Sequence, residues 1–107
     1  MHYSFTEILQ SPTTQIILPG ENATFRCNVS RWGYWIVNGN RDTTLWVSRG
    51  IASSVNEMTA QEPADTTTSL TLTISGQHLN NGSRIQCYAY DDTPFPVISN
   101  ISYLIIA

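Results

Sequence analysis

Charged side chains are scarce in this chain of 107 residues, which holds five Lys and Arg residues, eight Asp and Glu residues and a net charge of −3. The five basic residues are not clustered, so the basic stripe that binds nucleic acid or anionic lipid is absent. Long hydrophobic runs are missing as well. The longest near an end is YLIIA, far short of the ~20 residues that span a membrane. We therefore predict no nucleic-acid partner and no membrane span within these residues.

Histidine and cysteine, which supply many ligands and nucleophiles, number two each. His2 and His78 lack the spacing of metal ligands, and the two cysteines form no CxxC motif. The chain also contains no GxSxG, HExxH or phosphate-binding loop. We therefore predict no catalytic residue, no metal site and no cofactor, and the chain is not expected to be an enzyme.

The cysteines, Cys27 and Cys87, lie 60 residues apart. They could be free thiols, a redox pair or one disulfide. A structural disulfide is the preferred interpretation. On the chain-entropy model, closing a loop of that length stabilises a fold by roughly 4 kcal/mol.

N-glycosylation sequons are frequent for so short a chain. Each has the acceptor pattern Asn-X-Ser/Thr without proline in the middle. They begin at Asn22, Asn28, Asn81 and Asn100. Together with the predicted disulfide, they indicate an oxidising, extracellular location with N-linked glycans.

Alternation of apolar and polar residues is the commonest pattern in the sequence, and it is typical of half-buried strands. Three segments carry this pattern clearly, at 22–29, 69–76 and 84–90. Turn signals separate them, so short strands at this spacing predict an antiparallel sandwich or barrel. The predicted inward positions are Ala23, Phe25, Cys27, Val29, Leu70, Leu72, Ile74, Ile85, Cys87 and Ala89.

One stretch, residues 53–69, is polar and weakly patterned. We expect edge strands and loops there, with a short helical turn near residues 57–61.

Four segments carry a resemblance to a known family: PGENATFRC (19–27), WIVNG (35–39), TSLTLTISG (68–76) and NNGSRIQCYA (80–89). In this order they resemble strands B, C, E and F of the immunoglobulin superfamily, together with the turns beside them. The resemblance implies an all-β Greek-key sandwich of two antiparallel sheets, with an inter-sheet disulfide packed on Trp35. It also suits a type I′ turn at Asn38-Gly39. Residues 1–107 are thus expected to be a single immunoglobulin-like domain from a larger extracellular protein.

The subtype that the resemblance implies is variable-like or intermediate. The stretch between Trp35 and Leu70 is long enough for strands C′ and D, and for a further strand C″. Ile85 replaces the tyrosine of the usual tyrosine corner, and Asn81 replaces the aspartate of the usual Arg–Asp bridge. The last segment, SNISYLIIA, lacks an FGxG motif, which argues against a rearranged antigen receptor.

A candidate partner-binding face follows from strand parity. With Trp35 and Cys87 inward, the neighbouring side chains on the same two strands point out of the sheet, and aromatic residues are enriched in binding hot spots. The alternative is that these aromatic residues are covered by strand C′ and the F–G loop. The outward set is Tyr34, Ile36, Gln86, Tyr88 and Tyr90.

Two further tryptophans and one loop complete the candidates. Trp32 is expected in a short B–C loop, either as a lid over the core or as an exposed recognition residue. Trp46 belongs to the expected strand C′ and is counted with the partner-binding residues. In the loop DDTPFPV, prolines on both sides of Phe95 restrict the backbone. Phe95 is therefore either a stiff exposed anchor or a side chain folded onto the tyrosines. The acidic pair Asp91-Asp92 favours an electrostatic rim over a calcium site.

These residues predict an extracellular protein-recognition module. The partner is a protein, either a like domain in a homophilic contact or a different protein in a heterophilic one. The parent protein is expected to be a cell-surface adhesion molecule or an immune-type receptor. Two alternatives remain: a secreted soluble binder such as a decoy, a lectin-like protein or a viral mimic of a receptor, and a structural spacer in a longer array. A spacer would show no sizeable apolar patch on any face.

Overall fold

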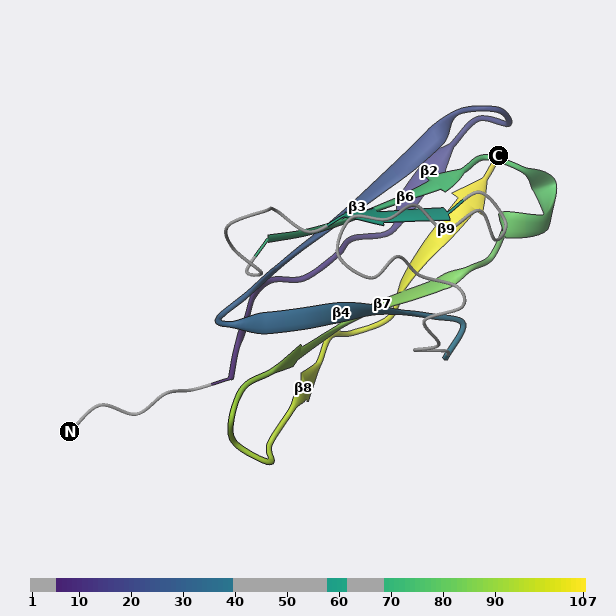
Figure 1. Cartoon of the computed structure of the whole chain (residues 1–107). Coiled ribbons are helices and arrows are strands. Elements are labelled where there is room, and N and C mark those ends of the chain that lie inside the picture. Colours follow the sequence, from purple (N-terminus) through teal and green to yellow (C-terminus); the bar gives the residue numbers. More distant parts are fainter. Residues whose placement is uncertain (1–5, 40–57, 62–68) are drawn as a thin grey trace.

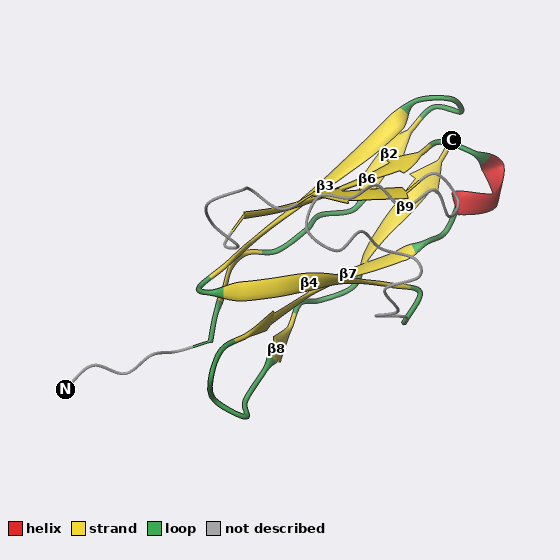
Figure 2. Ribbon diagram, viewed as in Figure 1, coloured by secondary structure: helices red, strands yellow, loops and turns green. Residues whose placement is uncertain are grey.

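Two β-sheets packed face to face make up this computed structural model, which describes residues 6–39, 58–61 and 69–107. Strands dominate the described residues, and a short 3₁₀ helix, η2 (His78–Asn80), joins two of them (Figures 1 and 2). No helix among the described residues is long and apolar enough to cross a membrane.

The first sheet contains β1 (Ile8–Gln10), β3 (Asn22–Val29), β5 (Met58–Gln61) and β6 (Ser69–Ser75), in the order β1-β3-β6-β5. Along β3 and β6, buried and more exposed residues alternate as the sequence predicts. The expected helical turn near residues 57–61 is wrong, because Met58–Gln61 is a strand paired antiparallel with β6. The edge strand expected within residues 53–69 is confirmed, because β5 is the last strand of the sheet. Its exact position was not predicted, since backbone pairing with β6, a long-range contact, decides its conformation.

The second sheet contains β2 (Gln15–Ile17), β4 (Trp32–Val37), β7 (Arg84–Tyr90) and β9 (Ser102–Ile106), in the order β2-β9-β7-β4. A two-residue strand, β8 (Val97–Ile98), also pairs with β7 and precedes β9 in the chain. The six residues between β7 and β8 form a loop (91–96) at one end of this sheet, and the C-terminus lies at the other end (Figure 1).

The N-terminal strand divides between the sheets, a feature that sequence periodicity does not predict. β1 pairs antiparallel with β3, whereas β2 pairs parallel with β9. Pro12 lies between them and cannot donate a backbone hydrogen bond to a ladder, which favours a break there. Its carbonyl oxygen accepts a hydrogen bond from the Ser102 hydroxyl at 2.7 Å. The crossing segment is thereby tied to β9.

The core lies between the sheets and is closed by a disulfide. Cys27 of β3 and Cys87 of β7 are bonded and fully buried, so the link joins one sheet to the other. Trp35 of β4 lies opposite Cys87 in register and is also buried. Its indole nitrogen has no hydrogen-bond partner among the described residues. The predicted disulfide and the core position of Trp35 are both confirmed.

Two asparagine side chains stabilise the turns at the end of the sandwich where β7 begins, one in the turn after β4 and one in the turn after η2. Asn38 and Gly39 both have positive φ angles, of 52° and 80°, as the predicted type I′ turn requires. The Asn38 side chain accepts a hydrogen bond from the Arg84 amide at 2.9 Å. Asn81 follows η2, and its side-chain oxygen accepts one from the Ile106 amide at 2.9 Å. Side-chain amides therefore fix this end, where the sequence lacks the usual Arg–Asp bridge.

Candidate functional site

The outward side chains of β4 and β7 form an aromatic surface, which we call the tyrosine face. The two strands pair antiparallel with Trp32 opposite Tyr90 and Tyr34 opposite Tyr88. Residues opposite each other lie on the same side of a sheet, so the rings meet in rows. The face consists of Trp32, Tyr34, Ile36, Gln86, Tyr88 and Tyr90.

Ring contacts join the aromatic members into one cluster. Tyr34 stacks on Tyr88 with centroids 4.4 Å apart and planes at 17°. Tyr90 is tilted against both, at 5.8 Å from Tyr34 and 6.3 Å from Tyr88. Stacking partly covers the rings, so Tyr34 and Tyr88 are half-buried, while Tyr90 remains 39% exposed. The face is thus a pre-ordered aromatic surface rather than a set of separate side chains.

Trp32 belongs to this face and not to a loop. The expectation of a B–C loop position is wrong, because β4 begins at Trp32 and leaves only Ser30 and Arg31 between the strands. Trp32 shares the outward parity of Tyr34 and contacts Tyr90 at 5.8 Å between centroids. It is therefore not a lid over the core.

A glycine makes this arrangement possible. Gly33 points inward between Trp32 and Tyr34, and a Cβ there would lie 2.8 Å from the Tyr88 carbonyl oxygen and 2.9 Å from a Leu70 methyl. Any larger residue would push β4 away from β7 and from the core. The close approach of the two strands, and hence of their rings, depends on this glycine.

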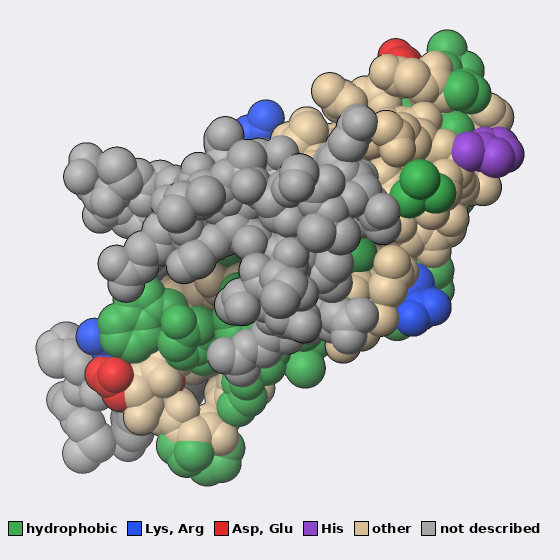
Figure 3. Space-filling model, turned by 45° about the vertical axis from the view of Figure 1, so that its right-hand side comes forward, with side chains coloured by type: hydrophobic (Ala, Val, Ile, Leu, Met, Phe, Trp, Pro, Cys, Tyr) green, Lys and Arg blue, Asp and Glu red, His purple; other side chains and the backbone are tan. Residues whose placement is uncertain are grey.

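Arg31 and Asp92 border the tyrosine face at the loop end. The guanidinium lies over the Trp32 ring at 4.0 Å and forms an ion pair with the Asp92 carboxylate at 2.8 Å. Both side chains are substantially exposed, so the pair contributes little to stability. In the space-filling view, hydrophobic side chains gather beside an acidic and a basic group at one end of the molecule (Figure 3).

The loop 91–96 is ordered by an aspartate turn. The Asp91 carboxylate accepts hydrogen bonds from the Thr93 hydroxyl at 2.6 Å and from the Thr93 amide at 2.7 Å. Hydrogen bonds from the Thr93 hydroxyl and, to a smaller extent, the Thr93 amide lower the pKa of Asp91 below its usual value of 3.8. This carboxylate is therefore charged at neutral pH, and the turn it makes is present.

Phe95 is the apex of that loop and is 74% exposed. Of the two arrangements that the sequence leaves open, the exposed one is found. Its neighbours Pro94 and Pro96 have fixed φ angles, so the ring is presented on a backbone with little freedom to lose on binding.

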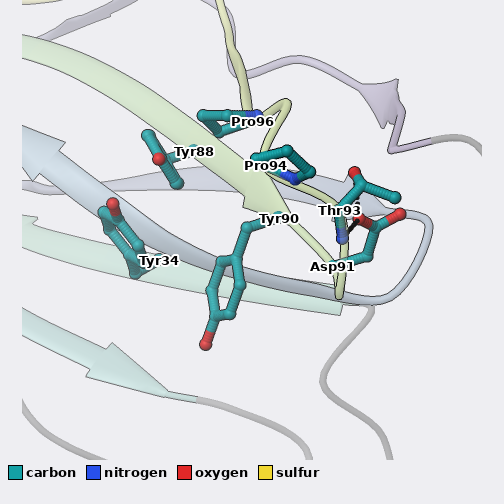
Figure 4. A pocket seen from close by; sticks show the side chains of 7 residues that line it. All are labelled: Tyr34, Tyr88, Tyr90, Asp91, Thr93, Pro94 and Pro96. Carbon is teal, nitrogen blue, oxygen red and sulfur yellow. Dashed lines mark hydrogen bonds between the residues drawn. The ribbon is translucent and has the colours of Figure 1, made fainter.

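A hollow of about 490 Å³ lies between the tyrosine face and the loop (Figure 4). The three tyrosines project on one side, and loop residues stand at the end beyond Tyr90. The hollow therefore combines an aromatic side with a loop side, and the Asp91 carboxylate there is turned toward Thr93. Its lining consists of Tyr34, Tyr88, Tyr90, Asp91, Thr93, Pro94 and Pro96.

The sheet continues the apolar surface on the other side of β7, where the sequence analysis named no candidate. We call this part the isoleucine margin, made of Ile16, Ile98, Tyr103 and Ile105, all of them exposed. Ile98 lies opposite Tyr88, and Ile16 lies opposite Ile105. The alternation in SYLIIA could have revealed Tyr103 and Ile105, but Ile16 joins them only through the parallel pairing of β2 with β9.

The sequon asparagines lie mainly away from the tyrosine face. Asn22 and Asn28 are on the outward side of β3 in the first sheet, where Asn28 donates a hydrogen bond to the Gln10 side chain at 3.1 Å. Asn81 lies in the turn after η2. Asn100 lies between β8 and β9 and is exposed. Trp46, the remaining candidate of the sequence analysis, lies outside the described residues.

No group of three or more His, Cys, Asp or Glu side chains that could hold a metal ion occurs in the part of the chain that the structure describes. The acidic pair of the loop has separate partners, because Asp91 binds Thr93 and Asp92 binds Arg31. This geometry fits the electrostatic rim better than a calcium site, which needs converging oxygen ligands.

Comparison with known proteins identifies the fold. No family model matches the chain, and no curated protein matches it. Among solved structures, 330 chains match. One is a chimeric titin Z1Z2-Z1Z2 tandem functionalised with an exogenous GRGDS peptide from fibronectin. It matches with a TM-score of 0.68 and 21% identity over 95% of this chain.

The fold is an immunoglobulin-like β-sandwich. The present chain spans 49% of the titin tandem's length. At that level of identity the likeness concerns the fold alone. Neither the variable-like or intermediate subtype nor a binding activity follows from it, so the function of this immunoglobulin-like domain must be argued from its own surface.

Proposed function

We propose that this chain is an extracellular protein-recognition module of a cell-surface adhesion molecule or immune-type receptor. It binds a protein partner through the tyrosine face and the loop 91–96. The observation that carries the proposal is that the loop directly following the ring-stacked tyrosines presents an exposed Phe95. Aromatic anchors of this kind, held in place before binding, are typical of interface hot spots.

The disulfide and the sequons support the extracellular part of the proposal. Disulfides persist in oxidising compartments and are rare in the cytosol. Glycans on Asn22, Asn28 and Asn81 would cover the first sheet and one end of the sandwich, leaving the tyrosine face open. Asn100 lies between β8 and β9, which both belong to the sheet that carries the tyrosine face.

Peptide mapping of protein from eukaryotic cells should therefore find glycan at Asn22 and Asn28 before Asn100. Bare Asn22 and Asn28 with a glycosylated Asn100 would contradict this choice of face.

Exposed apolar side chains also speak against the structural-spacer alternative. A spacer needs no partner surface, yet Phe95 and the isoleucine margin expose large apolar groups to solvent. Contiguous exposed apolar patches of more than a few hundred Å² usually mark an interaction site. The gene sequence that follows the codon of Ala107 distinguishes an anchored receptor from a secreted binder. An anchored receptor should encode an apolar span of ~20 residues there, and a secreted binder should not.

A binding experiment tests the proposal with a matched control. Multimers of the glycosylated domain are used to stain a panel of cells, and bound multimer is measured by flow cytometry. Phe95→Ala should weaken binding by about 2 kcal/mol or roughly 30-fold, as loss of a hot-spot residue does. Leu79→Ala is the control, since Leu79 is 63% exposed but belongs to η2, which lies at the opposite end of the molecule from the loop 91–96 (Figure 2).

Tyr90→Ala provides a second test on the same face, because Tyr90 lines the hollow and remains partly exposed. It should reduce staining while Leu79→Ala does not. Equal staining by the parent and all three variants would place the partner elsewhere, and the proposed face would be wrong.

A further inference from the structure

The chain between β8 and β9 contains one residue more than regular pairing with β7 allows. Ser102 lies opposite Ile85 of β7. The Ser99 amide donates a hydrogen bond to the Cys87 carbonyl at 2.8 Å, and the Cys87 amide donates one to the Ser99 hydroxyl, also at 2.8 Å. One residue separates the two β7 partners, whereas two residues separate the two serines. Two residues opposite one is the arrangement of a β-bulge.

Both of the bulged residues are exposed, and one of them is a sequon asparagine. The two serines are buried, so Asn100 and Ile101 are left on the solvent side, where both are exposed. Ile98 shares that side because it lies opposite the outward Tyr88, and Tyr103 shares it because it alternates with buried neighbours in β9. Asn100 therefore lies within a row of exposed apolar side chains, the apolar file, which consists of Ile98, Ile101 and Tyr103.

The sequon asparagines of the first sheet lie on a different kind of surface. Asn22 and Asn28 are near the two ends of β3, and the outward residues between them are Thr24 and Arg26. The residues opposite these four on β6 are all serine or threonine, namely Ser69, Thr71, Thr73 and Ser75. On the outward side of these two strands a glycan has only polar neighbours. Asn100 differs because its outward neighbours along β8 and β9 are apolar.

We propose that an N-linked glycan on Asn100 packs against the apolar file and covers it. The first sugar, N-acetylglucosamine, has a ring face made of C–H groups, and burial of apolar side chains against such a face removes them from water. The members of the file are at most three residues from Asn100, which is about 10 Å at roughly 3.3 Å per residue. The chain thus supplies, through its own sequon, the group that covers these exposed apolar residues.

The glycan would also limit where a protein partner can bind. Glycans are attached in the secretory pathway, so this inference rests on the extracellular part of the proposed function. β7 separates β8 and β9 from β4, and both β8 and β9 run beside β7 (Figure 1). A glycan held against Ile98 and Tyr103 leaves Trp32 and Tyr34 of β4 uncovered. The partner is thereby confined to the tyrosine face and the loop 91–96.

The test compares proteins secreted by eukaryotic cells, with the occupancy of each sequon checked by peptide mapping. Asn100→Gln removes the glycan and keeps a side-chain amide. It should lower the melting temperature by about 4 °C or more, a shift that accompanies the loss of a well-packed contact in a small domain. Asn22→Gln is the matched control, because it removes a glycan from a polar surface. It should change the melting temperature by roughly 1 °C at most.

A second pair of substitutions shows whether the stabilisation comes from the apolar file. Ile101→Ser and Tyr103→Ser together remove two of its side chains and leave the sequon intact, since only proline is excluded from the middle position. In this background Asn100→Gln should cause less than half of the shift that it causes in the parent, because the two changes remove the same contact. An undiminished shift would mean that the glycan acts without the file, and the inference would be wrong.

Nuclear magnetic resonance gives a direct view of the same contact. The parent should show nuclear Overhauser effects between the ring or N-acetyl protons of the first sugar on Asn100 and the ring protons of Tyr103 or the methyl protons of Ile101. A glycosylated protein without any of these effects has its glycan in solvent, which overturns the inference.

An Asn100 that is bare in the secreted protein overturns the inference as well. That result leaves the proposed function standing if Asn22 and Asn28 carry glycans and Phe95→Ala still weakens cell staining by multimers. A protein that Asn100→Gln destabilises as expected, but whose staining ignores Phe95→Ala and Tyr90→Ala, contradicts the proposed face alone. The two proposals therefore fail through different measurements.

Discussion

The ring of Tyr34 lies on the ring of Tyr88, with centroids 4.4 Å apart and planes inclined by 17°. The two residues are opposite each other on β4 and β7, so the stack joins the strands as well as forming part of the exposed face. Stability and the proposed recognition role therefore share these side chains, whereas Phe95 shows no packing role among the described residues.

The stack should be measurable as a coupling between the two tyrosines. We expect Tyr34→Leu and Tyr88→Leu each to lower the free energy of unfolding, and the double variant to lose less than the sum. A coupling of about 0.5–1.5 kcal/mol is expected for an aromatic pair beyond its buried area. Urea denaturation of the four proteins measures it. Strict additivity would mean that the rings do not support one another.

Gly33 should not tolerate a side chain. In Gly33→Ala the new Cβ would lie 2.8 Å from the Tyr88 carbonyl oxygen, a backbone atom that cannot rotate away. Overpacking of this kind costs about 1–3 kcal/mol, and β4 should shift outward with its rings. Denaturant unfolding gives the loss in stability, and near-ultraviolet circular dichroism reports the aromatic cluster. An alanine variant with parent stability and spectrum would contradict the close approach of the strands.

Trp35 should be the most sensitive position of the core outside the disulfide. Trp35→Ala leaves a large cavity beside Cys87 and should lower the free energy of unfolding by about 3–5 kcal/mol. Trp35→Phe should cost clearly less, since it keeps most of the ring and removes an indole N–H that has no partner among the described residues. Thermal and urea unfolding of the oxidised protein compare the two. Equal losses would show that the N–H is satisfied in solution.

Asp91 should add a pH-dependent contribution to stability. Its hydrogen bonds from the Thr93 hydroxyl and amide lower the pKa in the folded chain below 3.8, so the unfolded chain binds the proton more readily. The stabilisation is therefore present above 3.8 and is lost as the pH falls through the lower folded value. Asp91→Asn keeps an oxygen acceptor but removes the charge. The parent and this variant should differ more in stability at neutral pH than below the folded pKa. A pH-independent difference between them would contradict the shift.

The strands with clear alternation could be predicted from sequence together with their inward residues. In β3, β6 and β7 each side chain's face is a local property, because successive residues of a strand point to opposite sides. The same parity placed Tyr34, Tyr88 and Tyr90 outward. It could not show that the rings touch, since contact depends on which residues lie opposite across two strands.

The errors share one cause. Met58–Gln61 was expected to be helical and Trp32 to be in a loop, yet both lie in strands whose partners are distant in the sequence. The isoleucine margin was not predicted for the same reason, because Ile16 lies beside Ile105 only through the pairing of β2 with β9 in the second sheet.

The amino-acid sequence alone therefore determined the all-β class, the preference for a Cys27–Cys87 disulfide, the core position of Trp35 and the direction in which most side chains point. The class, the disulfide preference and the side-chain directions follow from period-two alternation and residue chemistry, which act locally, whereas the core position of Trp35 was implied by the resemblance to the immunoglobulin superfamily. Only the tertiary structure decided which strands pair, which rings touch and that Phe95 stands free of the tyrosines. Backbone hydrogen bonds between distant segments set those relations, and no local pattern encodes them.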